Sequence, residues 1–164
     1  MTDRATRASL DGDDLATWAA LATVLEWLPP ALDAPLFREF ELTHFEYGVL
    51  YALAAVEGRQ LRVSTLAGYA NSTISRVSRA VSRLQVRGLV ERRRDALDGR
   101  SMLVVLTAEG AELYERATPV HAESVHHLVL DALTAAQRRQ LREIAGRIQR
   151  AVRQDDGWRP RATE

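Results

Sequence analysis

Apolar positions recur with helical spacing along most of this 164-residue chain, and the first such pattern predicts a long N-terminal helix. It begins at Asp11 and is expected to end at Leu28, because Pro29 and Pro30 follow and proline removes a helical hydrogen bond. The apolar residues at this spacing are Leu15, Trp18, Ala22 and Leu25. Residues 1–10 are polar and are expected to be flexible.

A second predicted helix opens on a capping box, in which the side chains of Thr43 and Glu46 each accept from a backbone amide of the first turn. We expect it to run to about Glu57, where a glycine follows. Its inward residues are Phe45, Val49, Leu50 and Leu53. Ser64 is predicted to cap a short third helix that ends at Tyr69.

A fourth predicted helix separates apolar and cationic residues onto two faces whose centres are about 135° apart. Asn71 suits the tight turn before it, Ser72 or Thr73 can cap it, and Gly88 ends it. The apolar face holds Ile74, Val77, Val81 and Leu84, and the cationic face holds Arg76, Arg79, Arg83 and Arg87. Such a helix packs one side on a domain and presents the other to a negatively charged partner.

Two strands are predicted next, Val90 to Arg94 and Met102 to Leu106, joined by a polar connection that contains a glycine. Thr107 starts another helix in which Pro119 marks a bend or restart, and a second capping box, Thr134 with Gln137, opens the last helix. The middle helices and the two strands form a unit too small to bury all the apolar residues of the last two helices. The simplest way to bury the rest is contact with a partner chain. Those residues are Val120, Val125, Leu128, Val129, Leu133, Leu141, Ile144 and Ile148.

Charge is distributed unevenly along a chain whose formal net charge is zero. Residues 1–57 carry a net charge of −7, and residues 58–100 carry +7. Every cation other than histidine is an arginine, a side chain suited to phosphates and guanine edges. Cysteine is absent, which excludes disulfides and thiolate zinc sites, and we see no signal-peptide pattern and no apolar run near the length that spans a bilayer.

These motifs, in this order and spacing, resemble the MarR (multiple-antibiotic-resistance regulator) family of dimeric winged helix-turn-helix transcription factors. The resemblance runs from about Leu42 to Gly110. It is carried by Leu42-Thr43 with Tyr47, by Ser75–Arg79 with Arg83-Leu84 and Gly88–Arg92, and by Asp98–Arg100 with Leu106–Gly110. One departure is Gly99, which stands where many members have a second arginine.

The resemblance implies a DNA-binding face on the fourth helix and the hairpin. Ser75, Arg76, Ser78 and Arg79 would face base edges or nearby phosphates, with Ser72 and Thr73 at the start of the helix. Arg83 would contact a phosphate or form a structural pair. Arg100 would enter the minor groove with Asp98 holding its guanidinium, and Arg92 and Arg94 would approach phosphates.

Several residues admit two interpretations. At least one of Arg92, Arg93 and Arg94 could instead pair with Glu91 or Asp95. An effector pocket between the long helices and the DNA-binding head could be lined by Trp18, His44 and Tyr47, although aromatic residues at helical spacing are more often plain core. The spacing of His121, His126 and His127 is poor for joint ligation, so we expect no metal and no cofactor.

We therefore expect a mostly α fold with a small β-hairpin wing. A single domain would span residues 11–154, with the winged helix-turn-helix over about 42–107, dimerisation helices over about 11–30 and 108–153, and a disordered tail at 155–164. The function expected is a cytoplasmic homodimeric repressor that binds pseudo-palindromic duplex DNA and is relieved by a small aromatic or phenolic effector, with no membrane partner. No nucleophile–base pair or phosphate-binding loop indicates an enzyme. The alternative is a winged-helix module that binds an acidic protein.

Overall fold

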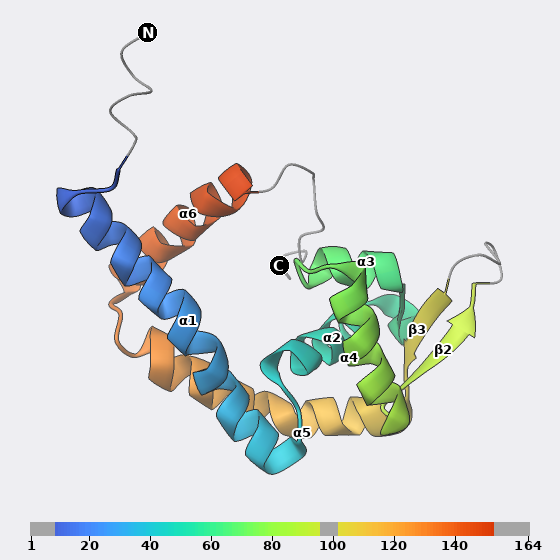
Figure 1. The fold of residues 1–164 in the computed structure, drawn as a ribbon. Coiled ribbons are helices and arrows are strands. Elements are labelled where there is room, and N and C mark those ends of the chain that lie inside the picture. The colour runs from blue at the N-terminus through green and yellow to red at the C-terminus, as the bar shows by residue number, and fades with distance from the viewer. Residues whose placement is uncertain (1–8, 96–101, 153–164) are drawn as a thin grey trace, which may run out of the picture.

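A computed structural model describes residues 9–95 and 102–152 and shows a helical protein with a three-stranded antiparallel sheet (Figure 1). Its elements are α1 (Gly12–Phe40), α2 (His44–Ala54), β1 (Gln60–Arg62), α3 (Val63–Tyr69), α4 (Ile74–Val86), β2 (Val90–Arg94), β3 (Met102–Leu106), α5 (Ala108–Val125) and α6 (Ala135–Val152). A 3₁₀ turn, Glu57–Arg59, precedes β1, and a π-helical segment, His126–Leu130, follows α5. The predicted fold class is confirmed.

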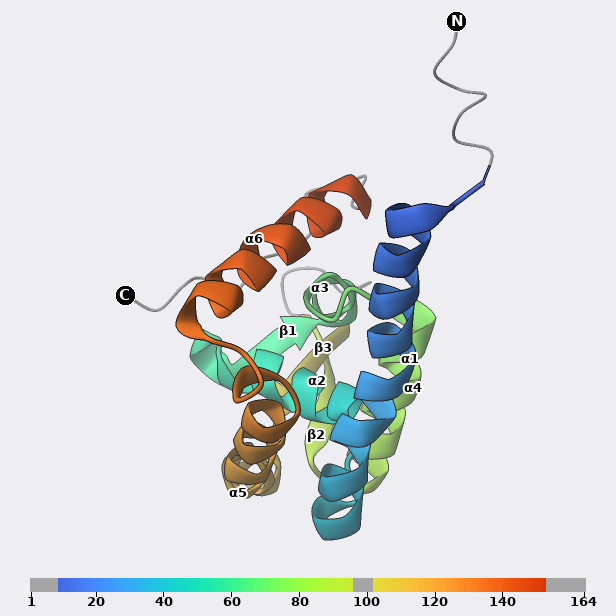
Figure 2. The ribbon, with the colours of Figure 1, turned by 90° about the vertical axis from the view of Figure 1, so that its left-hand side faces the viewer.

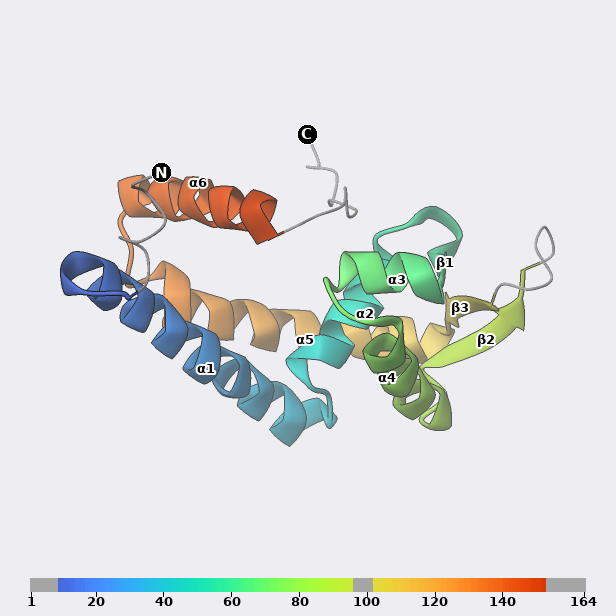
Figure 3. The ribbon, with the colours of Figure 1, turned by 45° about the horizontal axis from the view of Figure 1, so that its top comes forward.

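Two groups of elements lie side by side along the molecule. The sheet packs with α2, α3 and α4 into a compact head, while the N-terminal half of α1, the far end of α5 and α6 extend to the other side (Figure 3). In Figure 2, α6 slants upward from the left, and the first turns of α1 lie to the right of it. Helix α5 runs from the head to the side where α6 and the N-terminal half of α1 lie (Figure 3).

Helix α1 is longer than the sequence predicted. It continues through Pro29, Pro30 and Pro35 and ends at Phe40, where Glu41 takes a left-handed φ of 53°. Leu32, Leu36 and Phe40 in this second half are buried, and burying each such side chain contributes roughly 1.5–3 kcal/mol. That burial offsets the helical hydrogen bonds that the prolines cannot donate.

By length and composition α1 would also pass as a membrane-crossing helix, so the expectation that no apolar run approaches that length was wrong. A single helix of this kind near the N-terminus is weak evidence for a membrane. Only 6% of its most apolar window is buried within the chain. The exposed large apolar residues of α1 are Leu15, Trp18, Val24, Leu25, Trp27 and Phe37.

The capping box that opens α2 is confirmed, but the following elements differ in detail. Helix α2 ends at Ala54, and Gly58 supplies the positive φ of 73° inside the 3₁₀ turn. Ser64 lies within α3 and is not its cap. Strand β1 was missed by the sequence analysis because it is only three residues long, and it pairs with β3 so that Leu61 faces Val104.

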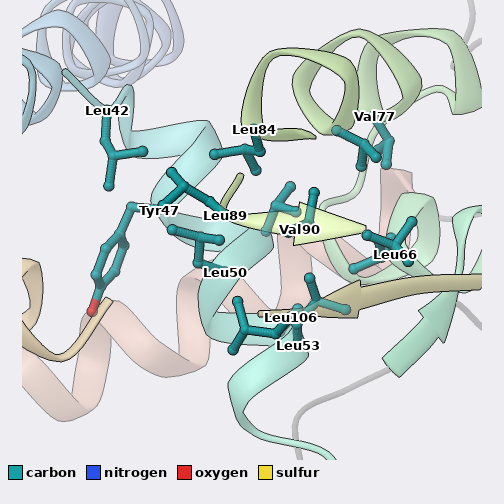
Figure 4. Packing of buried hydrophobic residues seen from close by; sticks show 14 of the residues in the cluster. Leu42, Tyr47, Leu50, Leu53, Leu66, Val77, Leu84, Leu89, Val90 and Leu106 are labelled. Carbon is teal, nitrogen blue, oxygen red and sulfur yellow. The ribbon is translucent and has the colours of Figure 1, made fainter. Parts of the chain in front are cut away.

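The core lies between α2, α4 and the sheet (Figure 4). Val77, Val81 and Leu84 of α4 are fully buried as predicted, together with Ala80. Ile74 was expected on this face but is 59% exposed, because the first turn of α4 extends past the core. The two predicted strands are confirmed, with Val90 paired to Leu106.

Helix α5 begins at its Thr107 cap and continues through Pro119, so the helix does not restart at this proline, which was one of the two outcomes expected there. The capping box of Thr134 and Gln137 before α6 is confirmed. The large apolar residues of α6 remain exposed in the single chain; they are Leu141, Ile144, Ile148 and Val152. No buried residue is found in α6.

Candidate nucleic-acid interface

Helix α4 is held by a tight turn from α3 and by its own cap. Asn71 takes a positive φ of 44°, as predicted, and the Ser72 amide donates to the Ala67 carbonyl at 3.0 Å. Thr73 is the cap, and its hydroxyl accepts from the Arg76 amide. The geometry is that of a helix-turn-helix, with the exposed side chains of Ser75, Arg76, Arg79 and Arg83 on the surface of the second helix.

The first turn of α2 lies beneath the arginines of α4. The Arg76 guanidinium lies 4.3 Å from the centre of the Phe45 ring, a cation–π contact. The Arg83 Nε donates to Glu46 Oε1 at 2.6 Å. Within the described residues Arg79, which lies between these two arginines, pairs with no acid.

A cleft of about 440 Å³ opens where α1, α2 and α4 meet. It is lined by Pro29, Asp33, Thr43, His44, Phe45, Arg76, Arg79 and Arg83. Three guanidinium groups against the one carboxylate of Asp33 give the cleft a positive character. The Asp33 carboxylate is partly engaged, because it accepts from the His44 amide at 2.6 Å.

Glu46 is one of two buried charged residues in the described chain, with 4% of its surface exposed. Its Oε2 accepts from the amide and the hydroxyl of Thr43, each at 3.0 Å, and its Oε1 accepts from Arg83. The capping motif in the sequence predicted the role of Glu46 at the start of α2, but not its contact with Arg83 of α4. A capping motif indicates contacts between residues three apart, and it does not indicate a contact with a residue 37 positions away.

Several arginines near α4 are held by the protein itself. Arg87 donates to the carbonyls of Phe40 and Glu41, both at 2.7 Å, and so closes the end of α1. Arg92 on β2 donates to the carbonyl and hydroxyl of Ser78 and to the Ser82 hydroxyl. These bonds tie the wing strand to α4.

The prediction that one arginine of the triplet pairs with an acid is confirmed, because Arg93 bonds Glu91 at 2.8 Å. Asp95 is 7% exposed and pairs with Arg62 of β1. Arg94 is exposed on β2. Asp98 and Arg100, predicted for the minor groove, lie outside the described residues, as do the predicted tail at 155–164 and residues 1–8 of the predicted flexible segment 1–10.

A second cluster, a stack of aromatic rings, joins α2 to α5. The His121 ring lies 4.3 Å from that of Tyr47 and 5.2 Å from that of His44, and Tyr114 lies 5.5 Å beyond Tyr47. The Tyr47 hydroxyl is 3.2 Å from that of Thr118. The rings of His44 and His121 are stacked at an angle of 11°, so their in-plane lone pairs lie side by side and do not converge on one ion.

The environment lowers the pKa of both imidazoles in this stack. Burial lowers the pKa of His44, an effect that the nearby Asp33 carboxylate partly opposes. Burial also lowers the pKa of His121, and His44 adds to the shift. His44 Nδ1 and His121 Nε2 are buried and have no hydrogen-bond partner among the described residues.

The three residues predicted for an effector pocket do not line one cavity. His44 lines the cleft, Tyr47 is buried in the aromatic stack, and Trp18 is 51% exposed in the first half of α1. By contrast, the structure brings Ser75, Arg76, Arg79 and Arg83 together on α4, with Ser72 and Thr73 at its start. Phe45 and Asp33, which line the cleft with them, were not singled out from the sequence as site residues.

Comparisons with known proteins agree with this geometry. A model of the MarR family matches residues 40–101. The transcriptional regulator HosA of Escherichia coli O157:H7 is 35% identical over 97 residues, which are 59% of this chain and 70% of HosA. The solved structure of Sco3205, a MarR family transcriptional regulator from Streptomyces coelicolor in complex with DNA, is 34% identical with a TM-score of 0.87. That match covers 93% of this chain and 95% of Sco3205.

A structure solved with a bound ligand is also similar. The PcaV transcriptional regulator from Streptomyces coelicolor, in complex with its natural ligand, is 27% identical with a TM-score of 0.75. The match covers 88% of this chain and all of PcaV.

Proposed function

The chain belongs to the MarR family of DNA-binding transcriptional regulators, and from this premise we propose that it is a sequence-specific homodimeric repressor relieved by a small effector. The observation that carries the DNA-binding site is the exposed arginine row on α4. It stands in a segment of net charge +7, and Ser75 and Thr73 beside the arginines let the backbone approach phosphates. That the similar Sco3205 was solved in complex with DNA supports DNA as the partner.

Within this surface we assign direct DNA contacts first to Ser75, Arg76 and Arg79. Arg94 on the wing strand, and Arg100 with Asp98 at the wing tip, complete the proposed contacts. Ser72 and Ser78 lie at its edges. The Nη2 group of Arg92 already donates to hydroxyl and carbonyl acceptors of α4, so the first role assigned to Arg92 is to hold the wing strand against that helix.

The test is a fluorescence-anisotropy titration of the protein with a duplex from the region upstream of its own gene and with a shuffled duplex of equal composition. We expect tighter binding of the upstream duplex, and log affinity that falls linearly with log salt at about 0.9 per phosphate contacted. A flat salt response would refute the proposed interface. Binding of an acidic protein in place of DNA would instead support the alternative of a protein-binding module.

The exposed apolar faces of α1 and α6 support the homodimer. A contiguous apolar surface of this kind usually marks an interface. Their charges are also complementary, because the first turn of α1 carries Asp13 and Asp14 while α6 carries five arginines and one acid. A dimer would place two recognition helices about 34–36 Å apart, one turn of DNA.

The dimer is tested by analytical ultracentrifugation. The wild-type chain should sediment as a dimer, and Ile144→Glu, which places a charge in the exposed apolar face of α6, should shift it toward monomer. A matched control is Gln149→Glu, which adds the same single charge to the same helix at an exposed position outside that face. A monomeric wild type, or an unchanged Ile144→Glu variant, would count against this interface.

The effector is proposed to bind where the long helices meet the head. The cleft that His44 lines has room for a small aromatic or phenolic molecule, and PcaV was solved with a natural ligand. Occupying it would disturb the α1–α4 contact and the spacing of the two heads. Release of DNA by members of a phenolic panel, read by anisotropy, would support this, and no release by any member would refute it. A regulator of this kind would act in the cytoplasm.

A further inference from the structure

We propose that Glu46 is a positioning residue that sets the orientation of the recognition helix through Arg83, an inference that rests on the proposed DNA-binding role of α4. In this proposal Arg83 binds Glu46 within the protein and does not contact a DNA phosphate. This separates it from Arg79, which lies one turn earlier on the same helix.

The geometry centres on one buried carboxylate with two separate tasks. Glu46 Oε2 fixes the start of α2 by accepting from the amide and the hydroxyl of Thr43. Its Oε1 holds the second half of α4 through the 2.6 Å bond from Arg83 Nε. Nε precedes the two terminal nitrogens along the arginine side chain, so this bond fixes the side chain between Glu46 and α4 and leaves the outer end of the guanidinium out of the contact.

The neighbouring residue of α2 adds a second restraint on the same face. Phe45 lies under the Arg76 guanidinium, so α2 contacts α4 one turn before and one turn after Arg79. Arg79 is left with no acid partner within residues 9–95 and 102–152. The first turn of α2 thus orients α4 and leaves Arg79 available to a phosphate.

Electrostatics and positioning predict opposite results when Glu46 loses its charge. A carboxylate near a DNA-binding face repels phosphates, so removing it should by itself strengthen DNA binding. Positioning predicts weaker binding, because α4 loses its anchor. The sign of the effect therefore discriminates between the two.

Glu46→Gln is the most informative substitution. Glutamine can still complete a capping box, so α2 should begin where it does now. Its single side-chain oxygen cannot serve both Thr43 and Arg83, and the amide group would face Arg83 as a second donor. Thermal melting of each variant, followed by circular dichroism, checks that the fold is retained.

The experiment measures anisotropy against salt for the upstream duplex and the shuffled duplex. The variants are Glu46→Gln, Arg83→Ala, the double variant, and Arg79→Ala. Glu39→Gln, on an exposed acid of α1 that pairs with its neighbour Arg38, is the control for loss of a negative charge.

We expect Glu46→Gln and Arg83→Ala each to weaken binding to the upstream duplex by on the order of tenfold. The double variant should be no weaker than either single variant, because each removes the same contact. The salt slope should stay unchanged in all three and fall by about 0.9 in Arg79→Ala.

The proposal is overturned if Arg83→Ala lowers the salt slope as Arg79→Ala does, or if Glu46→Gln binds as tightly as Glu39→Gln. If the wild-type protein itself shows no salt-dependent binding, the proposed DNA-binding interface is wrong. If the wild-type protein binds as expected and only the variants depart from expectation, the positioning role of Glu46 alone is wrong.

Discussion

Gly110→Ala offers a sharp test of the packing between the wing and the head. Gly110 is the third residue of α5, and a Cβ built there would lie 2.0 Å from the Leu89 carbonyl oxygen and 2.8 Å from Leu106 Cδ1. The Leu89 oxygen cannot easily retreat, because it accepts from the Thr107 amide at 3.2 Å. Leu89 and Leu106 are each only 6% exposed.

The expected cost follows from these distances. Restoring an ordinary contact requires α5 and the start of β2 to separate by roughly 1 Å, and overpacking of this kind costs about 1–3 kcal/mol or more. Alanine regains up to about 1 kcal/mol of helix propensity. We therefore expect a net loss near 2 kcal/mol, which lowers the melting temperature of a protein this size by about 4–8 °C.

The assay is thermal unfolding followed by circular dichroism, with Gly48→Ala as the matched control. Gly48 lies inside α2, and a Cβ there meets no atom within 4 Å. This control should gain about 0.5–1 kcal/mol from helix propensity alone. A Gly110→Ala variant that melts at or above the wild-type temperature would refute the reasoning.

Two further predictions concern buried ionisable groups. Because the pKa of His44 and of His121 is lowered in the folded chain, the unfolded chain binds protons first, so the free energy of unfolding should fall as pH drops below about 6.5. In His44→Gln, the free energy of unfolding measured with denaturant should change less with pH in this range. His127→Gln, on an exposed residue, should leave the pH dependence as in the wild type. The same pH dependence in both variants would contradict the prediction. Asp95→Asn should cost about 1 kcal/mol in urea unfolding, since it weakens the bond from half-exposed Arg62, and an unchanged midpoint would count against that pair.

Local features of the fold could be predicted from sequence because each depends on neighbouring residues. The caps at Thr43, Thr73 and Thr107 and the positive φ of Asn71 are examples. The two faces of α4 follow from a single helical period. Strand β1 could not be found in this way, because three residues carry no period and depend on β3 for pairing.

The candidate site was predicted in outline and not in its internal contacts. The arginines of α4 were identified from their spacing and charge. Sequence spacing did not show that Glu46, 37 residues earlier, holds Arg83, or that Arg92 bonds the hydroxyls of α4. Such partners meet only after the chain has packed.

The sequence by itself determined where α2, α4, α5 and α6 begin, which face of α4 is cationic, and which family the chain resembles, since these depend on short-range patterns. Tertiary structure alone decided that α1 continues through three prolines, because the burial of Leu36 and Phe40 outweighs the lost hydrogen bonds. It also decided which arginines are engaged and which are available. A guanidinium's role depends on the acceptors within its reach, and those are set by packing between distant segments.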